Sequence, residues 1–146
     1  MNDTDTYSLL EKAIQNYNVA VNIYESFKSD EIYLNYSAYH LQQSVELAIK
    51  HVLEQNGVEY PKEHAIERLI AIASQNGIDC AAEGYIDDHA EMFSAWEAKT
   101  RYIKDYKVEL RKVEIALNEV NEFLDRICGL EIEEEKEGHG DAGDDL

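Results

Sequence analysis

The chain has 146 residues, a length that fits a single domain with its own hydrophobic core. Apolar residues form 45% of the sequence and charged residues 30%, a balance that excludes the fibrous and disordered classes. The formal net charge of −18 excludes broad, non-specific nucleic-acid binding unless basic residues are concentrated locally.

Helical periodicity begins near residue 10, and the first apolar series follows one helix face: Leu10, Ala13, Ile14, Tyr17, Val21, Tyr24 and Phe27. Ser29 or Asp30 can cap a second helix over about 31–55, which Asn56-Gly57 ends. The face of this second helix is predicted to carry Ile32, Tyr36, Tyr39, Gln43, Leu47, Ile49 and Leu53.

Two shorter helices are predicted over about 64–74 and 85–99, separated by the loop 78–84. The last helix has the clearest pattern, with apolar residues spaced alternately by three and four: Ile103, Tyr106, Leu110, Val113, Leu117, Val120, Leu124 and Ile127. Cys128-Gly129 is predicted to end it. No segment alternates with period two, so the sequence predicts an all-α fold, an up-and-down bundle of four to five helices over residues 1–130.

Residues 131–146 differ from this body, because they hold eight acids, one base and three glycines without apolar periodicity. This composition predicts a disordered acidic tail. No apolar run reaches the ~18–20 residues of a membrane span, and the N-terminus lacks a signal-peptide stretch. We therefore expect a cytoplasmic protein that does not enter membranes, with Cys80 and Cys128 as reduced thiols.

Several motifs resemble the HEPN domain, a small helical bundle. They are the run Tyr39 to Lys50 (YHLQQSVELAIK), the link Asn56 to His64 (NGVEYPKEH), Trp96, Thr100-Arg101-Tyr102 and Asp105-Tyr106. The resemblance extends over roughly residues 7–127. It implies a homodimer, a partner of the minimal nucleotidyltransferase type, and a role as a toxin–antitoxin or nucleotide-binding pair.

Ribonuclease members of the family carry an arginine followed, after four to six residues, by a histidine. Arg101 matches the arginine, but the three positions where the histidine would fall are Tyr106, Lys107 and Val108. A phenol titrates near ~10 and does not replace an imidazole as a proton carrier at neutral pH. The sequence therefore predicts no catalytic residue, and Tyr106 fits a core or interface position as well as a site.

Basic residues are concentrated around Arg101, because six of the 13 lie in positions 99–112: Lys99, Arg101, Lys104, Lys107, Arg111 and Lys112. They form either an anion-binding site or ion pairs with acids on other helices or on a second subunit. Glu46 shares one helix side with Gln42, Gln43 and Lys50, either as part of a site with Arg101 or as a solvated face. The candidate binding residues are Arg101, Glu46, Asp105, Tyr106 and Lys104.

The histidines and acids show no metal-ligand spacing, so we predict neither a metal nor a cofactor. Three functions stay open. The first is a nucleotide- or anion-binding subunit, dimeric and paired with a nucleotidyltransferase, without efficient catalysis. The second is an RNA-cleaving toxin with a degenerate motif, and the third is an interaction module whose bases form ion pairs between subunits.

Overall fold

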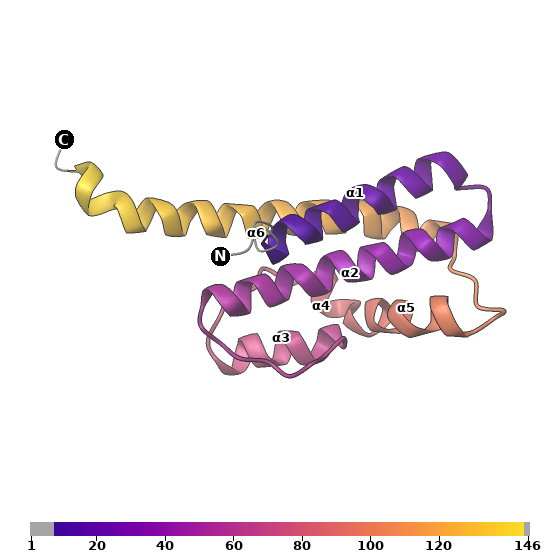
Figure 1. The fold of residues 1–146 in the computed structure, drawn as a ribbon, viewed down its shortest axis with the longest axis horizontal. Coiled ribbons are helices and arrows are strands. Elements are labelled where there is room, and N and C mark those ends of the chain that lie inside the picture. The colour runs from indigo at the N-terminus through magenta and orange to yellow at the C-terminus, as the bar shows by residue number, and fades with distance from the viewer. Residues whose placement is uncertain (1–7, 145–146) are drawn as a thin grey trace, which may run out of the picture.

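The computed structural model describes the backbone of residues 8–144 and the side chains of residues 8–130. These residues form helices and no strand, which confirms the all-α bundle (Figure 1). In chain order the helices are α1 (Leu9–Phe27), α2 (Glu31–Gln55), α3 (Ile66–Gln75), α4 (Tyr85–Asp88), α5 (Ala90–Tyr102) and α6 (Leu110–Asp144). The backbone breaks at His89, so the single helix predicted over 85–99 is two helices, and the second extends to Tyr102.

The helix starts and stops follow from local chemistry. The Ser8 hydroxyl accepts a hydrogen bond from the Glu11 amide, and the Asp30 carboxylate accepts one from the Ile32 amide, as expected of N-caps. Gly57 and Gly77 take the left-handed conformation after α2 and α3, with φ of 68° and 67°. Of the predicted N-cap alternatives Ser29 and Asp30, the structure selects Asp30, and the predicted stop at Gly57 is confirmed.

α2 is the central helix, because it packs against α1, α3, α5 and α6. It is buried on several sides, through Leu34, Ala38, Leu41, Val45, Ala48, Ile49 and Leu53. The face predicted for this helix is wrong at its N-terminal end, where Ile32 is 68% and Tyr36 is 54% exposed. The first turns of α2 lie at the end of the bundle, where neighbouring helices cover fewer of its sides (Figure 1).

α6 begins later than its apolar spacing predicts. Ile103 has an extended backbone and, with Tyr106, lies in the segment 103–109 between α5 and α6. From Val113 to Ile127 the predicted seam is confirmed, since Val113, Val120 and Ile127 are at most 1% exposed. The helical backbone then passes Cys128-Gly129, where the sequence placed its end, and continues through Asp144. The predicted tail 131–146 lies outside the side chains that the structure describes, and its disorder stays a prediction.

The end of α1, the start of α2 and the end of α5 lie together at one end of the bundle, at the right of Figure 1. This arrangement brings the segment 99–112, which holds the concentrated basic residues, beside the exposed start of α2. Within the described residues, no helix combines the length and the apolar character needed to cross a membrane.

Candidate functional site

The segment 103–109 is held against α2 by one side chain. The Asn35 amide donates to the backbone carbonyl of Tyr106 (2.7 Å) and accepts from the backbone amide of Val108 (3.0 Å). One asparagine thus satisfies a donor and an acceptor of a segment that has left regular helix. Val108 is buried beside this clamp, whereas Lys104 and Lys107 stay exposed.

A cavity of about 260 Å³ lies between the start of α2 and the end of α5. Three cationic side chains line it, Arg101, Lys104 and Lys107, together with Asn35 and the partly buried Tyr106. None of the side chains lining this described cavity is a histidine. Of the predicted site residues, Arg101, Lys104 and Tyr106 therefore meet at one place, whereas Glu46 and Asp105 do not line the cavity.

Arg101 is held by its own helix and by two aromatic rings. Its Nε donates to the backbone carbonyl of Glu97 (2.9 Å), and its Nη2 donates to the Glu97 carboxylate. The guanidinium carbon lies 5.2 Å from the ring centre of Tyr39 and 4.7 Å from that of Tyr102. Both contacts are within the range of cation–π attraction, so the guanidinium has a defined position at the end of α5.

The other cations of the basic segment differ in their partners. Lys107 pairs with Glu31 (3.0 Å), and this carboxylate raises the pKa of the Lys107 ammonium by hydrogen bonding and charge. Lys99 lies 5.9 Å from the ring centre of Tyr106. Lys104 forms no ion pair among the described residues. The predicted ion pair with an acid on another helix is thus found for Lys107, whereas Arg101 pairs with an acid of its own helix.

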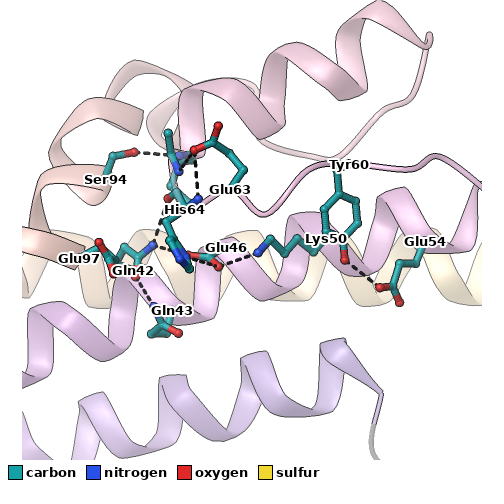
Figure 2. Close-up of polar contacts among 12 residues, drawn as sticks. Gln42, Gln43, Glu46, Lys50, Glu54, Tyr60, Glu63, His64, Ser94 and Glu97 are labelled. Carbon is teal, nitrogen blue, oxygen red and sulfur yellow. Dashed lines mark hydrogen bonds and ion pairs between the residues drawn. The ribbon is translucent and has the colours of Figure 1, made fainter.

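Glu46 belongs to a second polar cluster, farther along α2 (Figure 2). Its carboxylate is 4% exposed and accepts from Gln42 (2.8 Å), Lys50 (2.9 Å) and Nδ1 of His64 (3.2 Å). Because a carboxylate only accepts, Nδ1 of His64 carries the proton in this contact. A buried carboxylate needs such a set of partners to offset its lost hydration. The solvated-face alternative for Glu46 is therefore wrong.

The Glu46 cluster also anchors the segment between α2 and α3. The Gln42 amide lies 3.4 Å from the backbone carbonyl of His64, and the Tyr60 hydroxyl donates to Glu54 (2.7 Å). The Lys50 ammonium lies 5.5 Å from the centre of the Tyr60 ring. The polar side chains on this side of α2 therefore hold the segment 57–65 against the helix.

The two clusters adjoin along α2 but do not share an ion pair. Arg101 contacts Tyr39, one turn before Gln42 and two turns before Glu46 on the same helix. The direct pairing of Glu46 with Arg101 that a shared site would show is absent from the described contacts, since Arg101 pairs with Glu97. Figure 2 draws Glu97 in the same region as Gln42, and α5, which carries Glu97, packs against α2.

Sequence reasoning missed three contributors: Asn35, Glu97 and His64. The partners of Asn35 lie 71 and 73 residues further along the chain, and no local pattern marks them. Glu97 had a usable signal, because it stands four residues before Arg101 on a helix. His64 appeared in the motif after Pro61, but its contact with Glu46 spans 18 residues.

No group of three or more His, Cys, Asp or Glu side chains within residues 8–130 is placed to hold a metal ion.

Comparison with known proteins places the chain in a family. No curated protein and no solved structure matches the chain. A family model of the HEPN domain, however, matches residues 6–134, which include the Arg101 cavity and the Glu46 cluster. The chain therefore belongs to the HEPN domain family.

Proposed function

We propose that this HEPN protein is a nucleotide- or anion-binding subunit of the toxin–antitoxin type that acts with a nucleotidyltransferase partner and does not cleave RNA efficiently. The observation that carries the proposal is the meeting of Arg101, Lys104 and Lys107 around one cavity in a chain of net charge −18. Local concentration of cations against such a field favours an anionic ligand.

Phosphate is the anion that this arrangement suits. A guanidinium offers paired donors that match phosphate oxygens, and its charge persists over the whole working pH range. The ammonium groups of Lys104 and Lys107 add point charges around the same cavity. The exposed aromatic ring of Tyr36, which also lines the cavity, offers a surface on which a nucleobase can stack.

The side chain at the position of the missing histidine supports binding without efficient cleavage. Tyr106 is partly buried, and its backbone carbonyl is held by Asn35. No imidazole stands at this position, and general acid–base help contributes about 10²–10⁴-fold to rate. Loss of that help leaves slow turnover at most.

Self-association belongs to the same proposal. Large apolar side chains are exposed around the cavity end of the bundle: Phe27, Ile32, Tyr33, Tyr36, Tyr102 and Ile103. We call these four aromatic residues and two isoleucines the aromatic patch. Phe27 and Tyr33 stack at 4.0 Å between ring centres, which gives the patch a flat, preformed part. Exposed patches of this kind favour interfaces, and a two-fold dimer would place two Arg101 sites near each other.

The proposal is tested with purified protein in two assays. Calorimetric titration with a nucleoside monophosphate should show binding that Arg101→Ala weakens by about tenfold, because a charged hydrogen-bonding partner is lost. Arg68→Ala is the matched control, since Arg68 also pairs with a glutamate but does not line the cavity. RNA incubated with the wild type should stay largely intact. Rapid cleavage that Arg101→Ala abolishes would instead establish the RNA-cleaving toxin.

A further inference from the structure

Two of the three cationic side chains around the cavity already form ion pairs with carboxylates of the same chain. Glu97 holds Nη2 of Arg101, and Glu31 holds the Lys107 ammonium at 3.0 Å. Both acids come from the elements that form the cavity, α5 and α2. The donors that phosphate would use therefore have internal partners before any ligand arrives.

We propose that Glu97, and more weakly Glu31, compete with the anionic ligand, so that phosphate binds by displacing a carboxylate of the protein itself. This inference rests on the proposed function and concerns the regulation of the same site. The unliganded protein keeps its cationic site closed to weakly charged anions. A ligand must therefore bind the Arg101 guanidinium more strongly than the Glu97 carboxylate does.

A competing role for Glu97 differs from a positioning role, and the contacts of Arg101 separate the two. Its guanidinium is also held through Nε to the backbone carbonyl of Glu97 (2.9 Å) and lies against the rings of Tyr39 and Tyr102. None of these contacts needs the carboxylate. Glu97→Gln keeps an acceptor oxygen but removes the charge, so it should weaken the contact at Nη2 without releasing the arginine.

The two acids should differ in strength because they differ in exposure. The Glu97 side chain is 15% exposed, whereas the Glu31 side chain is 61% exposed. Water screens an exposed pair strongly, so the contact of Glu31 with Lys107 competes less. The structure thus predicts an order of effects as well as a direction.

The experiment is a calorimetric titration of inorganic phosphate, at fixed low ionic strength, into the wild type and three charge-removing variants. Glu97→Gln should tighten binding by about two- to tenfold, and Glu31→Gln by about twofold or less. Glu63→Gln is the matched control, because Glu63 also pairs with an arginine, but that arginine (Arg68, 2.9 Å) does not line the cavity. It changes the net charge equally and should leave the affinity unchanged.

Each result bears on the proposal. Tighter binding by Glu97→Gln, alone or with Glu31→Gln, supports it. Equal or weaker binding by a folded Glu97→Gln overturns it and identifies Glu97 as a positioning residue, while phosphate binding by the wild type keeps the proposed function intact. If Glu97→Gln does not fold, the proposal is decided by Glu31→Gln. Tighter phosphate binding by Glu31→Gln than by Glu63→Gln supports it, and equal binding overturns it. No binding by the wild type or any folded variant would overturn the proposed function as well.

Discussion

Asn35 shows how one side chain shapes the candidate site from a distance. It satisfies the carbonyl of Tyr106 and the amide of Val108, and so fixes the segment that carries Lys104 and Lys107. An amide side chain is suited to this task because it donates and accepts at once. Arg101 lies at the end of a helix and needs no such clamp, whereas the two lysines do.

We expect Asn35→Ala to loosen the segment 103–109 while the bundle stays folded. Two backbone groups would lose their partners, which should lower the free energy of unfolding by about 1–3 kcal/mol. Hydrogen exchange at the Val108 amide should accelerate, and phosphate binding should weaken. Tyr17→Phe is the control, because it removes a hydrogen bond between α1 and the Leu117 carbonyl, outside the cavity. Unchanged exchange at Val108 would contradict the clamp.

Glu46 is the residue whose loss should harm the fold most. Glu46→Ala leaves Lys50, which is 13% exposed, and the buried Gln42 without their shared carboxylate. Breaking a buried charged network typically lowers the free energy of unfolding by about 3–5 kcal/mol. Urea denaturation measures this loss, with Glu122→Ala on the exposed side of α6 as a control expected within about 0.5 kcal/mol. Equal effects of the two substitutions would show that the cluster contributes little.

At the scale of elements, the segment 57–65 is fastened to α2 by polar contacts. Tyr60 takes part through its hydroxyl, which donates to Glu54, and through its ring, which lies near Lys50. Burial of the ring, and next the contact with Glu54, raise the pKa of Tyr60 well above its ordinary value. Since the folded pKa exceeds the unfolded one, this stabilisation is complete below the unfolded value and is lost as pH rises above it.

We therefore expect alkaline pH to destabilise the wild type more than Tyr60→Phe. Between pH 10 and 11 the wild type should lose about 0.5–1 kcal/mol more of its free energy of unfolding than the variant, after allowance for solvent screening. Urea unfolding at pH 8, 10 and 11 measures the difference. Parallel declines of the two proteins would show that Tyr60 does not contribute.

The elements were predictable where local chemistry decides them. Caps such as Asp30 and Gly57, and the seam from Val113 to Ile127, follow from sequence patterns alone. The start of α6 was not predictable in this way, because Ile103 and Tyr106 continue the apolar spacing although the chain is not helical there. Asn35 provides the competing tertiary hydrogen bonds, and its partners are distant in sequence.

The site was predictable in part for the same reason. Arg101, Lys104 and Lys107 stand close together in the sequence, so local charge counting found them. Charge counting did not show that Glu97 and Glu31 form ion pairs with two of these cations. The spacing of four residues marks the Glu97 pair, but the Glu31 pair depends on tertiary geometry. Burial of Glu46 likewise depends on how the segment 57–65 returns to α2.

At the scale of the whole molecule, the aromatic patch predicts a dimer. Ile32 and Tyr102 are 68% and 71% exposed. Monomeric proteins rarely expose several large apolar side chains together, so the patch indicates an interaction surface. Ile32→Asp combined with Tyr33→Asp should shift sedimentation at tens of micromolar protein toward the 16.8 kDa monomer. Ile115→Asp is the control, because Ile115 is also exposed but lies on α6, outside the patch. A wild type that sediments only as a monomer would contradict the dimer.

The central claim, that the Arg101 cavity is where this protein holds an anion, is tested most directly by an NMR titration with inorganic phosphate. Amide and arginine Nε signals report the location of binding residue by residue. The largest shifts should fall in residues 99–108 and 31–36, with Arg101 Nε among them. Arg101→Ala should raise the phosphate concentration needed to saturate the remaining shifts by about tenfold. Shifts centred on Lys50 and His64, or no saturable shifts, would contradict the account.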